Sequence, residues 1–215
     1  MTDKTSITTD RVVRYVLETE PDRAALHVAE SQRDSFVRAG GRAPEALTTH
    51  STDDPLWTAW VSGAAAAHDS NLTWVAVTAA ATALCDDERA VTAIALGRGV
   101  AELVAAALGD KHAAEGWDMR ATAGTVGAVA ATGRLCGLDS DQLRNAIGLA
   151  ATQAAGLLAA AGTDAEAIQV GKAAANAVEA ALLAECGFTS SAAPLEGRRG
   201  LLALMTDRPA EALQV

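Results

Sequence analysis

Alanine occupies 52 of the 215 positions in the sequence, and this excess constrains the fold more than any other feature. Alanine is the best helix former, whereas β-branched and aromatic residues favour strands. Half of the residues are hydrophobic but only 3% are aromatic, so a core is available without the residues that fill large sheets. No segment alternates convincingly with a period of two. The composition therefore predicts an all-α fold with closely packed helices and essentially no sheet.

The length predicts one helical domain over residues 1–215, structured from about residue 8 to about residue 206. Asp86, Asp118, Asp139 and Thr163 are expected N-caps, the last two in capping boxes with Gln142 and Glu166. Gly40 and Gly41 are expected to stop the second helix, and residues 42–54, 68–71 and 109–117 to interrupt the helical pattern. The predicted helices cover 11–18, 21–39, 55–67, 72–85, 87–108, 118–137, 139–160, 165–186 and 196–205.

The charge and the cysteines limit the partners and the compartment. Seventeen basic and 27 acidic residues give a net charge of −10, with no basic stripe, which argues against a nucleic-acid partner. Cys85, Cys136 and Cys186 are too widely spaced for a C-x-x-C pair, as in a reduced cytoplasmic protein. The N-terminus has no apolar signal core, and the longest uncharged run, 145–163, fits a buried helix better than a membrane span.

Glycine and alanine recur at helical spacing inside the predicted helices, as in Gly97 with Ala101 and Gly124 with Gly127. Glycine costs about 1 kcal/mol relative to alanine in a helix interior, so a compensating gain is expected. Close approach of two helices is the favoured explanation, and a ligand role is the alternative.

Familiar catalytic and cofactor motifs are absent from the sequence. Gly97-Arg98-Gly99 follows no predicted strand, so it does not mark a dinucleotide site. There is no G-x-x-x-x-G-K-[ST], H-E-x-x-H or G-x-S-x-G, and the four histidines show no metal-ligand spacing. We therefore expect no metal and no cofactor.

Three segments at helix ends carry candidate chemistry. His68 and Asp69 end a small-residue helix, and they offer acid–base groups beside a break, although an ordinary loop is the alternative. Residues 116–124 begin a helix whose N–H groups could bind an anion, unless Asp118 caps them. Glu166 begins the helix over 165–186, where capping alone would also explain it.

These segments, in this order, resemble the MmgE/PrpD family, which includes 2-methylcitrate dehydratase, cis-aconitate decarboxylase and iminodisuccinate epimerase. The stretch GWDMRATAGTVGAVAATGRLCGLDSDQLRNAIGLAATQAAGL is similar to the family's G-W-H-P-T-A-T-x-G run and the helices after it. GKAAANAVEAALLAECGFTSSAAPLEGRRGLLAL is similar to its G-R-A-A-x-N-G segment and the following L-E-G-x-x-G-F. PLWTAWVSGAAAAHDS resembles the stretch that leads into H-A-L-D-F-D-D-T-H.

The resemblance implies a large helical domain that forms a homodimer through helices, with a separate lid domain later in the chain. The sequence stops where the first helical part of such proteins ends, so we expect the lid to be absent. Members of the family bind a small organic substrate between the two domains. We therefore expect a small-molecule substrate here, and a site that is open or covered by another subunit or protein.

The departures from the family pattern change the expected charge of the site. His68 matches the family's first histidine, but the later acidic residues and the following H-P element are missing. Asp118 stands where the G-W-H-P motif has histidine, and in K-x-L-H-A-G-R the lysine, histidine and arginine correspond to Glu166, Gln169 and Lys172. Such a pocket would repel a di- or tricarboxylate, so we predict no turnover of methylcitrate or cis-aconitate.

Two functions are compatible with these residues. The first is an enzyme of lyase or isomerase type that performs cofactor-independent elimination, isomerisation or cyclisation on a small molecule. Its catalytic candidates are Asp118 and Glu166, whose proximity would raise the pKa of one of them, together with His68 and Asp69. Its substrate-binding candidates are Lys172, Gln169, Arg120, Trp74 and Trp117, although core packing also explains the two tryptophans. The second function is that of an inactive relative that binds a metabolite or a partner protein.

Overall fold

The computed structural model describes residues 7–39, 47, 53–69 and 72–206, and it confirms the all-α fold. Within these ranges the backbone forms helices and connecting turns but no strand. An isolated antiparallel bridge joins Trp117 to Leu157. The predicted stop at Gly40-Gly41 and almost all of the predicted loop over 42–54 lie outside the described residues.

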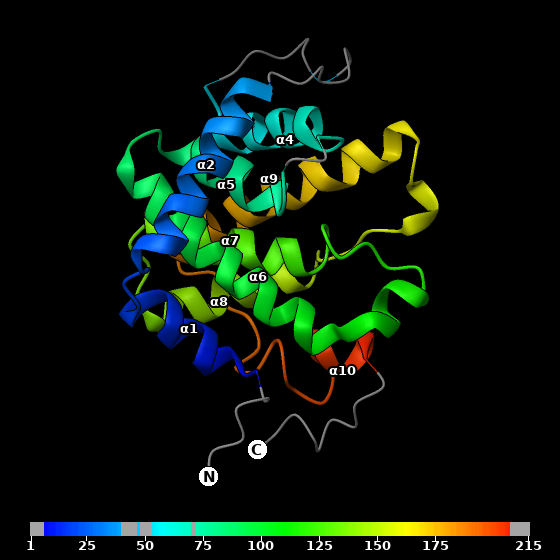
Figure 1. The fold of residues 1–215 in the computed structure, drawn as a ribbon. Coiled ribbons are helices and arrows are strands. Elements are labelled where there is room, and N and C mark those ends of the chain that lie inside the picture. Colours follow the sequence, from blue (N-terminus) through cyan, green and yellow to red (C-terminus); the bar gives the residue numbers. More distant parts are fainter. Residues whose placement is uncertain (1–6, 40–46, 48–52, 70–71, 207–215) are drawn as a thin grey trace.

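The helices follow one another with short connections (Figure 1). Their bounds are α1 Thr9–Glu18, α2 Arg23–Ala39, α4 Pro55–Ala66, α5 Val75–Leu84, α6 Glu88–Ala114, α7 Ala123–Leu135, α8 Ser140–Ala151, the 3-10 turn η1 Leu158–Ala160, α9 Asp164–Glu185 and α10 Leu201–Met205. The Asp139–Gln142 capping box at the start of α8 is confirmed.

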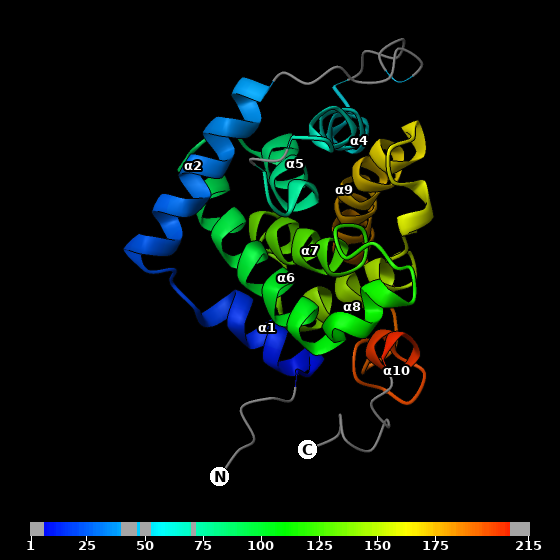
Figure 2. The same cartoon turned by 45° about the vertical axis from the view of Figure 1, so that its right-hand side comes forward.

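Helix α7 lies in the middle of the fold and packs against α5, α6, α8 and α9 (Figure 2). Every residue from Ala123 to Gly133 is buried, because this helix carries only small and apolar side chains and threonines there. Helix α4 packs on α9 at one end of the molecule, while α1 and α10 lie at the other end (Figure 1). The alanine-rich helices thus surround a central helix that has no exposed face over most of its length.

The small residues permit close helix contacts at two crossings. A Cβ atom added at Gly97 of α6 would lie 2.6 Å from the Gly127 carbonyl oxygen of α7, and one added at Gly171 of α9 would lie 2.3 Å from the Trp60 carbonyl oxygen of α4. The packing explanation is therefore confirmed for Gly97 and Gly127. It does not extend to Gly124, whose added Cβ would meet nothing closer than 3.8 Å.

Four predicted helix boundaries are wrong by five or more residues, each where the chain turns. Helix α6 continues to Ala114 across a non-helical glycine, Gly109, with φ 70° and ψ 179°. The helix predicted from Asp118 begins only at Ala123, because residues 117–122 form turns held by the segment after α8. The helix predicted over 139–160 ends at Ala151, and the last helix begins at Leu201, since turns precede it.

Helix α6 is the one described helix that is long and apolar enough to cross a membrane by length and composition. In the structure, 56% of its most apolar window is buried against other helices. Core helices of globular proteins have the same length and composition, so this helix gives only weak support for a membrane span.

Candidate functional site

The turn after α6 places the Asp118 carboxylate inside the protein. The Asp118 N–H donates to the Gly156 carbonyl over 2.9 Å, next to the Trp117–Leu157 bridge. Asp118 Oδ1 accepts the Arg120 backbone N–H over 2.9 Å, as in an Asx turn. The side chain is only 3% exposed. Asp118 therefore caps its own turn, five residues before α7 begins.

Arg120 links Asp118 to Glu166, which comes from the first turn of α9. Its Nη2 atom lies 2.6 Å from Asp118 Oδ2 and 2.7 Å from Glu166 Oε1, and its Nε donates to Asp118 Oδ1 over 3.0 Å. Its Nη1 reaches the Ala67 carbonyl at the end of α4 over 3.3 Å. One guanidinium thus joins two carboxylates with charge-assisted hydrogen bonds, which are stronger than neutral ones.

Gln169 and the segment before α9 complete this cluster. Gln169 Nε2 donates to Asp118 Oδ2 over 2.7 Å, while its Oε1 accepts the Leu157 N–H over 2.9 Å. Glu166 Oε2 accepts the Gly162 N–H over 2.7 Å. We call Asp118, Arg120, Glu166 and Gln169 the Arg120 network. It ties the turn before α7 to the start of α9.

The capping box predicted at the start of α9 does not form as expected. The Thr163 hydroxyl donates to the Ala160 carbonyl over 2.6 Å instead of accepting from the helix. Glu166 accepts from Gly162, one residue before the expected partner, because the 3-10 turn η1 brings that N–H to the carboxylate. Glu166 still binds a free N–H group at its own helix start.

The expected rise in the pKa of one carboxyl is wrong. Burial by itself would raise the pKa of Asp118, but hydrogen bonds from the Arg120 side chain and backbone outweigh it and lower the pKa. The pKa of Glu166 is also lowered, first by the Gly162 N–H and then by Arg120. The carboxylates do converge, but the guanidinium between them favours the ionised form of both. The predicted mutual repulsion is therefore absent.

His68 and Asp69 lie at the end of α4, beside the network. His68 Nδ1 is 3.7 Å from Glu166 Oε2, and its side chain is 56% exposed. The Asp69 N–H closes the turn on the Ala66 carbonyl over 3.1 Å. The helix break predicted at this point is confirmed for these two residues, whereas Ser70 and Asn71 lie outside the described residues.

A cavity of about 590 Å³ opens next to the Arg120 network, between α9 and the segment over 153–163. Gln169 and Lys172 line it, whereas Asp118 and Glu166 do not. The Lys172 ammonium lies 4.9 Å from the centre of the Trp60 ring. Lys172 and Gln169 therefore line the cavity, whereas the two acidic candidates do not.

Asn176 is a cavity residue that the sequence reasoning did not single out. It lines the cavity one helical turn after Lys172, is 5% exposed, and its Oδ1 is buried without a hydrogen-bond partner. A polar side chain inside the apolar run KAAANAVEAA was the available signal, because buried amides are normally hydrogen-bonded.

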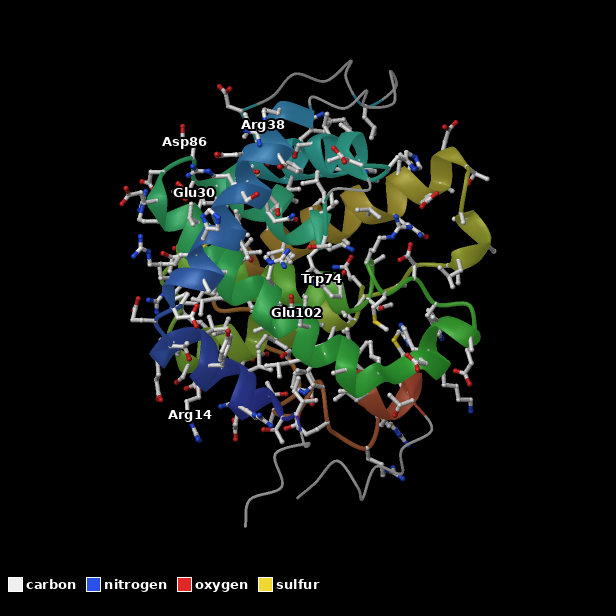
Figure 3. The ribbon with its side chains drawn as sticks, viewed as in Figure 1. Arg14, Glu30, Arg38, Trp74, Asp86 and Glu102 are labelled. Carbon is white, nitrogen blue, oxygen red and sulfur yellow. The ribbon has the colours of Figure 1, made fainter. Side chains whose placement is uncertain are left out.

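The two tryptophan candidates are not among the residues that line this cavity. Trp74 precedes α5 with a left-handed backbone (φ 53°) and packs against the hydrophobic core. Figure 3 shows it near the centre of the view, with Arg14, Arg38 and Asp86 toward the rim. Trp117 stacks on His112, with ring centres 6.0 Å apart and planes 14° apart. Neither ring is among the residues that line the cavity, so both contacts fit the packing alternative.

The rest of the described chain offers no metal centre. Among residues 7–39, 47, 53–69 and 72–206, no group of three or more His, Cys, Asp and Glu side chains is arranged to hold a metal ion. Among the described residues that line the cavity, Lys172 is the one with a charged side chain.

Comparison with known families agrees with this helical arrangement. The model of the MmgE/PrpD N-terminal domain matches residues 45–214, which is most of the chain and includes every member of the Arg120 network. No curated protein matches the sequence. The resemblance noted in the sequence is thus confirmed over helices α4 to α10, and the chain belongs to the MmgE/PrpD family.

Proposed function

We propose that this chain is a small-molecule-binding member of the MmgE/PrpD family in which the Arg120 network organises the site and does not perform acid–base catalysis. The observation that carries this proposal is the position of Arg120, 2.6 Å from one catalytic candidate and 2.7 Å from the other. A general acid needs a proton to give, and a general base needs a free lone pair directed at the substrate. Both carboxylates are held in the ionised form by lowered pKa values, and each of their oxygens already accepts a hydrogen bond within the protein.

The burial of Asp118 supports the same conclusion. Its side chain is 3% exposed, and its two oxygens accept hydrogen bonds from Arg120 and Gln169. A substrate would have to displace these partners to reach it. The cavity beside the network is a better place for a ligand, because about 590 Å³ lies within the range of small-molecule sites. Gln169 joins the two, since it lines the cavity and also holds Asp118.

A second candidate function is the lyase or isomerase chemistry expected from the sequence, and one observation favours it. The half-exposed His68 imidazole lies 3.7 Å from Glu166, an arrangement in which a carboxylate can orient an imidazole that moves a proton. In that reaction His68 would be the acid–base group, and Glu166 would position it. The elimination, isomerisation or cyclisation step would then depend on His68 and not on Asp118.

We also propose an oligomeric state and a compartment for the protein. From the resemblance we propose a homodimer, and from the composition a cytoplasmic protein without nucleic-acid or membrane partners.

The Arg120 network and Lys172 together carry two carboxylates and two cations. Methylcitrate and cis-aconitate remain poor candidates, because the carboxylates that replace the family's histidine and lysine do not bind further carboxylates.

The test separates binding from turnover. The purified protein is screened by thermal unfolding against small organic acids, amides and alcohols, and each compound that raises Tm is incubated with the protein and followed by NMR. We expect compounds that bind and are recovered unchanged, both with the wild type and with Asp118→Asn, Glu166→Gln and the matched surface control Glu185→Gln. A compound that is converted, with the conversion lost in Asp118→Asn or Glu166→Gln but kept in the control, would overturn the proposal. So would a screen in which nothing binds.

If conversion is instead lost in His68→Asn and retained in Asp118→Asn, the second candidate function replaces the first. The two outcomes are distinct because Asp118 pairs with Arg120, whereas His68 lies beside Glu166.

A further inference from the structure

One face of α9 turns four residues toward the cavity at helical spacing. Ala165, Gln169, Lys172 and Asn176 all line it, at intervals of four, three and four residues. Residues three and four apart lie on the same face of a helix, with Cβ atoms about 5 to 6 Å apart. A ligand lying along this face would therefore meet the amide of Gln169, the ammonium of Lys172 and the amide of Asn176 in succession.

Asn176 carries an unmet hydrogen-bonding requirement at the inner end of this face. Its residue is 5% exposed, and Oδ1 is buried without a partner. Leaving a buried acceptor unpaired costs free energy, so such groups normally have a partner in proteins. Because Oδ1 accepts and cannot donate, the missing partner must bring an O–H or N–H group.

Lys172 supplies a positive charge that no carboxylate neutralises within the described residues. The ammonium lies over the face of Trp60, and it takes part in no ion pair there. Lys172 lines the cavity, and its cation–π contact leaves the hydrogen-bond donors of the ammonium available. The remaining lining is mainly apolar, with Leu157, Ile168 and several alanines.

We propose that this cavity binds an organic monoanion with an apolar body, whose negative group pairs with Lys172 and whose hydroxyl or N–H group donates to Asn176 Oδ1. The inference rests on the proposed binding function and specifies its ligand class. A single cation favours one negative charge over several, and the apolar wall favours a hydrocarbon or aromatic body. The Arg120 network does not contact this ligand directly; Gln169 is the residue that the network and the cavity share.

Three probes of nearly the same shape separate the elements of this proposal. 3-Phenyllactate has a carboxylate, a hydroxyl and an apolar ring, 3-phenylpropionate lacks the hydroxyl, and 3-phenyl-1,2-propanediol lacks the charge. Binding of each is measured by isothermal titration calorimetry. We expect 3-phenyllactate to bind most tightly, and each of the other two to bind about tenfold more weakly, as for a lost hydrogen bond or charge pair of about 1.4 kcal/mol.

Variants identify the residues. Asn176→Leu should remove the preference for 3-phenyllactate over 3-phenylpropionate, and it should raise Tm, because it replaces a buried amide whose oxygen has no partner with an apolar side chain of similar size. Lys172→Met should remove the preference for the anion over the diol. Lys111→Met is the matched control, since that lysine lies on α6 and is not among the residues that line the cavity.

Several results would overturn the inference. They are equal binding of the three probes, no binding by 3-phenyllactate at millimolar concentration, or preferences that persist in Asn176→Leu and Lys172→Met. If other compounds still bind without being converted, the proposed binding function survives this failure. If the bound compound is converted, the proposed function fails while the assignment of Lys172 and Asn176 to the ligand can stand.

Discussion

Removing the Arg120 guanidinium tests the role of the network most directly. In Arg120→Met the side chain remains long and apolar, but it loses the donors that lie 2.6 Å and 3.0 Å from Asp118 and 2.7 Å from Glu166. The Asp118 side chain is 3% exposed, so water has little access to replace them. Removing one partner of a buried ion pair typically costs about 3 to 5 kcal/mol, because the other charge is left uncompensated.

The expected loss of stability lies at or below the lower end of that range. Arg120 itself is 34% exposed, which weakens its interactions through solvent screening. Asp118 also keeps its hydrogen bond from Gln169, and Glu166 keeps the Gly162 N–H. We therefore expect the free energy of unfolding to fall by about 2 to 3 kcal/mol. For a chain of this length the corresponding fall in Tm is roughly 4 to 12 °C.

The stability difference between the wild type and Arg120→Met should depend on pH. In the wild type the lowered pKa values of Asp118 and Glu166 mean that both carboxylates stabilise the native state above their ordinary pKa, and that this contribution is lost as pH falls through the lowered values. In Arg120→Met the burial of Asp118 acts without the guanidinium and raises its pKa. The variant should therefore gain stability relative to the wild type as pH falls.

Thermal unfolding by circular dichroism at pH 7 and pH 4.5 measures both effects. The gap in Tm between wild type and Arg120→Met should be large at pH 7 and smaller at pH 4.5. Arg89→Met is the control, because that arginine pairs with Asp87 at an exposed position, 74% exposed for Arg89, where an ion pair contributes little to stability. An Arg120→Met protein as stable as the wild type at pH 7, or a gap that stays constant with pH, would refute this account of the network.

Three further predictions concern the packing and the buried groups. Gly171→Ala should destabilise by about 1 to 3 kcal/mol in calorimetry, because its Cβ would lie 2.3 Å from the α4 backbone, whereas Gly124→Ala has 3.8 Å of space and should gain up to about 1 kcal/mol; equal effects would contradict the packing. Burial lowers the pKa of His112, so the unfolded state takes up the proton first and stability should fall below about pH 6.5, by at most about 1.4 kcal/mol per pH unit, and His112→Gln should remove this slope. Burial raises the pKa of Cys136 to about 11, so iodoacetamide at pH 8 should label the exposed Cys186 much faster, as mass spectrometry of the partly labelled protein would measure, and equal rates would refute this.

The fold class could be predicted from the sequence, because helix propensity and the spacing of alanine and glycine depend only on neighbouring residues in the chain. The close contacts predicted for Gly97 and Gly127 occur because small residues at helical spacing let the backbone of a second helix approach closely. The boundary at Asp118 was missed for the opposite reason. The carboxylate caps a turn that is held by the Gly156 carbonyl, 38 residues away in the sequence, and local cap rules contain no information about such a contact.

The sequence also predicted in part which residues lie together at the site. Asp118, Glu166 and Gln169 lie together as expected from the family pattern, but the sequence reasoning treated Arg120 only as a substrate contact and so predicted repulsion between the carboxylates. The pairing depends on the turn over residues 117–122, which directs Arg120 back toward Asp118, and that turn could not be derived from helix periodicity. The position of Asn176 inside an apolar run indicated a buried amide, but the lack of a partner for its Oδ1 depends on the packing of other helices and could not be derived from that run.

The substitutions that distinguish this chain from the family pattern depend on one another physically. A lysine at 166 would place a second cation against the Arg120 guanidinium, and a neutral histidine at 118 would offer one acceptor where Asp118 accepts three hydrogen bonds from Arg120. Gln169 donates to Asp118 and accepts from Leu157, and a protonated histidine there could only donate. Restoring one family residue alone should therefore destabilise the fold and should not recreate a catalytic site. The matched set ties the turn before α7 to the start of α9, because Arg120 needs both carboxylates and Asp118 needs both Arg120 and Gln169.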